Sequence, residues 1–156
     1  IVIVRDDLLG SALPETPKLL DYALFDEHHS LPNTINVFAV YVMRLMLEWV
    51  KEKGGVPEME KLADKKSALL YDVLDHSDFY LAVAHPEHRS TMNVTFHLPR
   101  DELLHKFLTE SDKEGFFGLM GHAIIGGARA SIYNAMPLEG VAELAKFMQE
   151  FERKNG

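Results

Sequence analysis

The sequence predicts an α/β chain whose larger part is a small α+β domain, with a mostly antiparallel sheet and helices on one face. From residue 56 onward the pattern runs helix, strand, strand, helix, strand, strand, helix. That order suits a small antiparallel sheet covered on one side. Upstream, residues 37–53 are typical of a long helix, and residues 1–4 (Ile-Val-Ile-Val) are typical of a strand buried on both faces.

The first strand leads us to expect that the chain is part of a larger protein. A strand that is apolar on both faces needs cover on each side. We therefore interpret residues 1–4 as a strand cut from a larger sheet, with the alternative that later strands cover it. Residues 5–32 form an irregular tract with Gly and several Pro. The run 26–29 (Asp-Glu-His-His) lacks helical metal-ligand spacing, so we expect a polar turn and no metal site.

The predicted helix over 37–53 is apolar nearly all round from Val37 to Leu47, apart from Arg44. Such a helix is typically buried on most sides, as between two domains or subunits. Gly54-Gly55 end it. The preceding Asn33-Thr34-Ile35-Asn36 leaves two interpretations open: helix caps, or side chains at a helix start that bind phosphate.

The remaining elements follow from periodicity and turn residues. A helix is expected over 57–75, with Met59, Leu62, Leu69 and Val73 on one stripe. A charged set is expected to face solvent: Glu58, Glu60, Lys61, Asp64 and Lys65. Strands are expected at 79–81, 92–98, 115–120 and 128–133, and further helices from Pro99 and over 138–153.

The stretch 121–141 holds the densest run of unusual residues. Gly126 and Gly127 precede the strand that carries Arg129, and Pro137 opens the last helix. A guanidinium at the mouth of a glycine-lined turn can clamp a carboxylate through paired hydrogen bonds. The alternative is an ordinary surface arginine in a salt bridge.

Composition excludes several classes of protein. The 156 residues are 47% hydrophobic and 26% charged, as in an ordinary globular protein. Without cysteine, disulfides and thiolate metal sites are excluded. The net charge of −8 argues against a nucleic-acid partner. No apolar run is long enough to predict a membrane span.

The same stretch resembles a known family. Residues 121–139 are similar to the C-terminal signature of phosphoserine aminotransferases. They read Gly-His-Ala-Ile-Ile-Gly-Gly-Ala-Arg-Ala-Ser-Ile-Tyr-Asn-Ala-Met-Pro-Leu-Glu. Those are pyridoxal-phosphate enzymes of fold type I. Matches at 89–94 and 147–151 extend the resemblance over essentially the whole chain. One position departs from it: Ala123 stands where the signature has Arg.

The resemblance implies a domain plan and a reaction. Residues 1–36 would be the incomplete end of the large pyridoxal-phosphate domain, 37–55 the interdomain helix, and 56–156 the small C-terminal domain. The complete enzyme would be a cytoplasmic homodimer with shared active sites. It would exchange an amino group between glutamate and 3-phosphohydroxypyruvate, in serine biosynthesis.

The resemblance also implies roles for individual residues. Asn33 and Thr34 would contact the cofactor phosphate across the dimer interface, although Ile35-Asn36 replace the usual prolines. Arg129 would bind the substrate α-carboxylate, and His122 the distal phosphate. Ala123 removes the cation that normally joins His122, a contact worth about 1.5–3 kcal/mol.

No catalytic residue is expected within the chain itself. In the family, the lysine that forms the Schiff base with the cofactor lies in Gln-Lys-Asn-x-Gly-Pro-x-Gly, just before the strand matching residues 1–4. That motif does not occur here, so the chain alone is expected to be inactive. P-loop, dinucleotide and Ser-His-Asp patterns are also missing. The competing interpretation is a non-catalytic module or pseudoenzyme remnant that binds a partner through residues 5–53.

Overall fold

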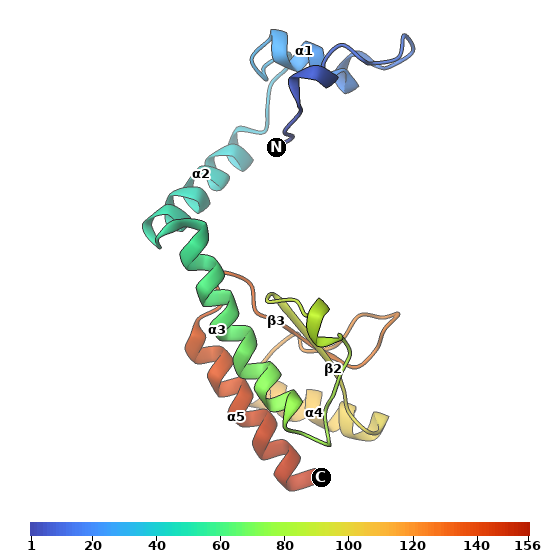
Figure 1. Ribbon diagram of the computed structural model, residues 1–156, viewed down its shortest axis with the longest axis vertical. Coiled ribbons are helices and arrows are strands. Elements are labelled where there is room, and N and C mark those ends of the chain that lie inside the picture. The colour runs from blue at the N-terminus through green and yellow to red at the C-terminus, as the bar shows by residue number, and fades with distance from the viewer. The chain divides into compact units, whose positions relative to one another are not determined.

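The computed structural model describes residues 1–156 and divides into two compact units, Ile1–Glu48 and Trp49–Gly156 (Figure 1). The first unit contains two 3-10 turns, Asp6–Leu8 and Lys18–Leu20, and the short helix α1, Tyr22–Glu27. Asp21 caps α1, because its carboxylate accepts a 3.0 Å hydrogen bond from the backbone N–H of Ala23. The irregular tract expected before residue 32 is thus confirmed, and it contains these three short helical segments.

The strand expected at residues 1–4 was wrong for this chain. These residues have no strand partner, and the side chains of Ile1 and Ile3 are 93% and 94% exposed. A strand exists only through hydrogen bonds to a neighbour. The unit offers none, so the run forms no strand and its first three side chains stay exposed.

Helix α2, Val37–Glu52, confirms the predicted long helix, and this chain by itself leaves the helix exposed. None of its residues is buried, and Phe38 is 76% exposed. Asn36 caps the helix by accepting a 3.0 Å hydrogen bond from the backbone N–H of Ala39. The apolar surface that predicted an interface is therefore present without anything packed on it.

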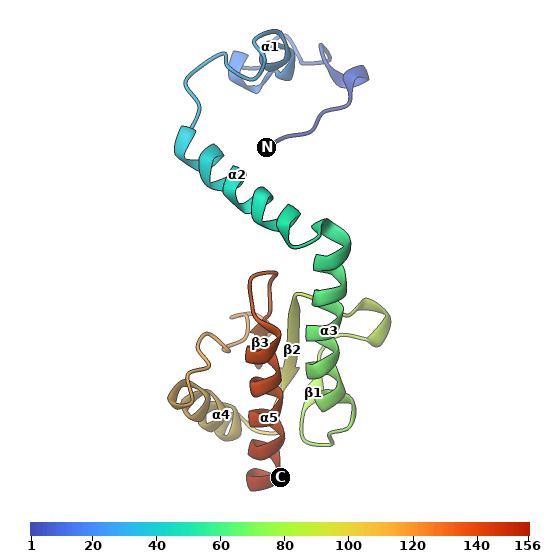
Figure 2. The same cartoon turned by 90° about the vertical axis from the view of Figure 1, so that its left-hand side faces the viewer.

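The second unit is the small α+β domain. Its helices are α3 (Gly55–Asp75), α4 (Asp101–Lys113) and α5 (Leu138–Asn155). Strands β1 (Leu81–Ala82), β2 (Asn93–His97) and β3 (Ala128–Ser131) form an antiparallel sheet in the order β1-β2-β3. Figure 2 shows α3 and α5 side by side across one face of this sheet, as the sequence predicted.

Two strands differ from the prediction. The one expected at 115–120 is reduced to a single bridge between Met120 and Ala128. Gly115 and Gly118 have φ angles of +88° and +74°, a left-handed conformation that interrupts a strand. The strand expected at 79–81 begins later, at Leu81, because Phe79 and Tyr80 turn into the core instead.

The core lies between the sheet and the helices. Val94 and Phe96 point inward from β2, and the ring of Phe96 meets that of Phe107 on α4 edge-on at 5.8 Å. Ala128 and Ala130 supply the inward positions of β3. Alternation along β3 therefore places the residue between them, Arg129, on the outer face of the sheet. No helix combines the length and the apolar character needed to cross a membrane.

Candidate functional site

A glycine-rich hairpin holds Arg129 at its base. The Met120–Ala128 bridge closes the segment 121–127, and the N–H of Gly121 donates to the carbonyl of Gly127 at 2.9 Å. Beyond the bridge, the N–H of Arg129 donates to the carbonyl of Leu119 at 2.7 Å. Backbone hydrogen bonds on both edges therefore fix the Cα of Arg129, as β2 pairs with its other side.

Only glycine fits at position 127. Its φ is +67°, and a Cβ there would lie 2.5 Å from the carbonyl oxygen of Phe96 and 2.8 Å from Nδ1 of His97. The sequence predicted close approach at the paired glycines, and the approaching group is the neighbouring strand β2. The glycines thus shape the hairpin that leads into Arg129.

The guanidinium of Arg129 has no protein partner. It makes no hydrogen bond or ion pair, and its Nε is buried without an acceptor. The salt bridge proposed as the alternative from sequence is not observed. A buried polar atom normally finds a partner, so a free one marks a place where a ligand can supply the acceptor. A carboxylate matches the planar fork of an arginine with two parallel hydrogen bonds.

Polar groups extend this outer face of the sheet beside Arg129. The hydroxyl of Ser131 donates to Oδ1 of Asn93 at 3.1 Å. Nδ2 of Asn93 donates to the hydroxyl of Tyr133 at 3.2 Å. The outer face is therefore polar and ordered by side-chain hydrogen bonds, whereas the inner face packs in the core.

His122 lies at the exposed end of the hairpin. Its carbonyl accepts hydrogen bonds from the N–H groups of Ile125 at 3.0 Å and Gly126 at 2.7 Å. Its Nδ1 accepts from the N–H of Ile124 at 3.2 Å, so a neutral ring carries its proton on Nε2. That leaves Nε2–H as a free donor toward an anion. Beside it, Ala123 and Ile124 provide no second cation.

Asn33 and Thr34 lie in the other unit, just before α2. Both residues are exposed, and neither side chain makes a hydrogen bond, because Asn36 alone caps the helix. The capping interpretation therefore applies to Asn36. The structure brings His122 and Arg129 onto one hairpin, and leaves the side chains of Asn33 and Thr34 free on their own unit.

Sequence reasoning missed Lys66. This residue is completely buried on α3, and its ammonium donates to the carbonyls of Ile132 at 2.9 Å, Tyr133 at 2.6 Å and Met136 at 3.2 Å. Burial lowers the pKa of Lys66. A signal was present: Lys66 is two helical turns from both Met59 and Val73, on the apolar stripe rather than the charged face.

A second cluster orders the loop that leads into β2. The guanidinium of Arg89 donates to Oδ2 of Asp75 at 2.7 Å and lies 4.4 Å from the ring centre of Tyr71. The hydroxyl of Tyr71 donates to the carbonyl of Ser90 at 3.0 Å. The hydrogen bond from Arg89 lowers the pKa of the Asp75 carboxyl. These contacts are internal, so the cluster is structural.

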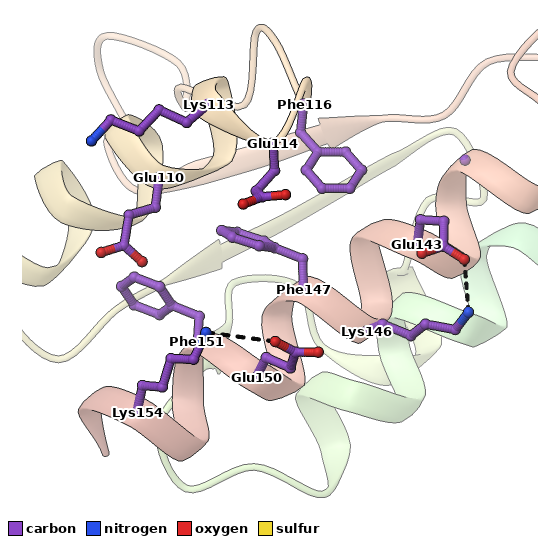
Figure 3. A pocket seen from close by; sticks show the side chains of 11 residues that line it. Glu110, Lys113, Glu114, Phe116, Glu143, Lys146, Phe147, Glu150, Phe151 and Lys154 are labelled. Carbon is purple, nitrogen blue, oxygen red and sulfur yellow. Dashed lines mark hydrogen bonds and ion pairs between the residues drawn. The ribbon is translucent and has the colours of Figure 1, made fainter.

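The groove between α4 and α5, of about 640 Å³, is separate from the predicted site (Figure 3). Phe116, Phe147 and Phe151 form its apolar lining. Two ion pairs form among its charged side chains, Lys146 with Glu143 at 2.7 Å and Lys154 with Glu150 at 3.6 Å. None of the residues predicted to bind cofactor or substrate lines it. No group of acidic or histidine side chains in the chain could hold a metal ion.

Comparison with known proteins adds the family to this geometry. The model of the class-V aminotransferases matches residues 1–144. The chain belongs to this family. The match includes both units and nearly all of the elements described above.

Curated relatives extend over the whole of this class-V aminotransferase chain. It is 49% identical over all 156 residues to the phosphoserine aminotransferase of Buchnera aphidicola subsp. Acyrthosiphon pisum (strain Tuc7). It is equally identical to the phosphoserine aminotransferase of Janthinobacterium sp. (strain Marseille). The resemblance found in the sequence is therefore confirmed. The chain spans 43% of the length of each of these relatives.

Solved structures confirm the fold class. Phosphoserine aminotransferase from Bacillus circulans subsp. alkalophilus matches 98% of the chain with a TM-score of 0.93 and 40% identity, over 43% of its own length. A PLP-bound phosphoserine aminotransferase from Trichomonas vaginalis matches 88% of the chain with a TM-score of 0.82 and 31% identity, over 40% of its own length. The small α+β domain of this family is the one predicted from the sequence.

Proposed function

We propose that this chain is the C-terminal part of a phosphoserine aminotransferase. The complete cytoplasmic enzyme would convert 3-phosphohydroxypyruvate and L-glutamate to O-phospho-L-serine and 2-oxoglutarate, in serine biosynthesis. The observation that carries the proposal is the unpartnered guanidinium of Arg129 on a glycine-shaped hairpin. Both amino-acid partners of this reaction present an α-carboxylate, the group that an arginine fork binds best.

Pyridoxal 5′-phosphate is the cofactor of the proposed reaction, and it supplies the group that accepts and returns the amino group. Asn33 and Thr34 fit its phosphate, because their amide and hydroxyl donors are exposed and uncommitted just before α2. The lysine that binds the cofactor is proposed to come from outside these residues. The chain contributes binding and orientation, and no catalytic residue.

His122 is proposed to bind the distal phosphate of the substrate. Its Nε2 is free, and its ring is held by the N–H of Ile124. A cation at position 123 would add a charge-assisted contact, which Ala123 does not provide. Discrimination between the phosphorylated substrate and glutamate therefore depends more heavily on His122.

The proposed domain plan assigns residues 1–36 to the large cofactor-binding domain, 37–55 to an interdomain helix and 56–156 to the small domain. In the proposed homodimer with shared active sites, the apolar surface of α2 is covered by the rest of the assembly. Its exposed Phe38 and Leu47 supply the surface that such an interface needs.

The test is steady-state kinetics on the complete enzyme. Arg129→Lys keeps the charge and loses the fork, so kcat/KM should fall for both half-reactions, by at least about tenfold or roughly 1.4 kcal/mol. Ala123→Arg should instead favour the phosphorylated substrate over glutamate. Values within about twofold after Arg129→Lys would show that Arg129 is structural.

The competing proposal is a non-catalytic module that binds a partner through residues 5–53. The exposed apolar face of α2 is compatible with it. A complete protein that binds pyridoxal phosphate but shows no transamination, together with a stable complex through α2, would favour the module.

A further inference from the structure

We propose that Lys66 is a positioning residue for Arg129, acting by fixing the exit of strand β3. The inference rests on the proposed function only in giving Arg129 a ligand; the positioning itself concerns contacts within the unit Trp49–Gly156. Lys66 reaches across from α3 to the carbonyls of Ile132, Tyr133 and Met136.

These three carbonyls belong to one turn. The N–H of Met136 donates to the carbonyl of Tyr133 at 2.9 Å, so the chain reverses between β3 and α5. The ammonium of Lys66 donates to that same carbonyl and to those on either side of the turn. A single side chain thus ties the end of β3 to the start of α5.

Strand β3 needs this support because it is short and weakly held on one edge. It pairs with β2 along its whole length, but on the other edge only the N–H of Arg129 reaches Leu119. Beyond that bond, residues 115–118 diverge and leave an apolar recess of about 270 Å³ beside Ala130 and Ile132. At its exit, β3 therefore has the clamp of Lys66 in place of a neighbouring strand.

The choice of side chain supports a specific role. An apolar residue would suit a stripe shared with Met59 and Val73, and a buried ammonium is costly unless it is well paired. Only a long side chain with three donors can satisfy three converging carbonyls. Removing the ammonium would leave the carbonyls of Ile132 and Met136 without their donor, and the carbonyl of Tyr133 with only the N–H of Met136, so the first two would draw the turn toward water.

The adjacent residue offers a matched control. Lys65 lies on the same helix but is exposed. On the unmodified chain, the ammonium protons of Lys66 should give a slowly exchanging NMR signal, coupled through hydrogen bonds to the carbonyls of Ile132 and Tyr133. Lys65 should give none. If Lys66 shows no protected ammonium signal, the clamp does not exist in solution and the proposal fails.

The Lys66→Met and Lys65→Met variants then test positioning. In the Lys66 variant, the amides of Ile132 and Met136 should exchange at least about tenfold faster, while those of the core residue Phe107 change less. The order parameter of the Arg129 Nε–H bond should also fall. Lys65→Met should leave both readouts unchanged. Equal acceleration at all amides would show a general stability role and overturn the proposal.

The failure of this inference differs from a failure of the proposed function. If Arg129→Lys has no kinetic effect but Lys66→Met loosens the turn and the guanidinium, then Arg129 is positioned but binds no substrate. If Lys66→Met does not fold, the ammonium signal of the unmodified chain still decides. In the complete enzyme, Lys66→Met should raise KM for glutamate more than it lowers kcat, and Lys66→Arg should restore part of the loss.

Discussion

Replacing Gly127 by Ala should destabilise the domain and displace the base of the hairpin. With φ at +67°, any residue other than glycine must adopt a left-handed backbone conformation, which costs about 1–2 kcal/mol of folding free energy. The added Cβ would also lie 2.5 Å from the carbonyl oxygen of Phe96, a backbone atom of the central strand that cannot swing aside. Overpacking of this kind costs typically about 1–3 kcal/mol, so the total is about 2–5 kcal/mol.

Gly126→Ala is the matched control. Gly126 has a similar φ of +74°, but nothing lies within 4 Å of the Cβ it would gain. Its loss should be limited to the backbone penalty of about 1–2 kcal/mol. Urea unfolding of both variants, followed by circular dichroism, measures the difference in the free energy of unfolding. Equal losses of unfolding free energy in the two variants would refute the steric argument, because only the cost of the left-handed backbone would then remain.

The remaining predictions use simple assays. The purified chain, given pyridoxal phosphate, glutamate and phosphohydroxypyruvate, should show no transamination; turnover with a borohydride-trapped lysine among these residues would contradict this. Hydrogen exchange should be fast throughout Ile1–Glu48, which buries no side chain, and slow in the core of Trp49–Gly156. Equal strong protection in both units of a monomer would overturn that expectation. Asp75→Asn should reduce stability at neutral pH, because Arg89 lowers the pKa of Asp75 in the folded state. A carboxyl whose pKa is lowered by folding stabilises the fold at pH values above its pKa in the unfolded chain. In urea titrations, the deficit should shrink below about pH 4; a deficit constant with pH would show that the ion pair contributes nothing.

The sequence predicted elements whose periodicity reflects burial within the chain itself. Helices α3, α4 and α5 and strands β2 and β3 fall close to their expected ranges, because each buries its apolar side in a core that these residues complete. Residues 1–4 form no strand and α2 is exposed in this chain for the opposite reason. Their apolar patterns indicate contacts that the chain does not contain.

Other differences arise from interactions that periodicity does not encode. The left-handed glycines Gly115 and Gly118 prevent the strand expected before the hairpin. The sequence interpretation assigned Lys66 no role, although its position on the apolar stripe indicated burial. For the candidate site, the sequence singled out Arg129 and its glycines, but only the structure shows that the guanidinium has no partner. The roles of Asn33, Thr34, His122 and Arg129 stay predictions.

The alternation along β3 makes the outward direction of Arg129 a consequence of core packing. Ala128 and Ala130 are each 1% exposed, and a strand that turns them inward must turn the residue between them outward. Burial of the methyl groups of Ala128 and Ala130 therefore sets the direction of the Arg129 side chain, and the hairpin tip does not. Sequence changes at 122–125 can then alter the tip without moving the arginine, so the selectivity proposed for the tip and the carboxylate binding proposed for Arg129 can diverge independently.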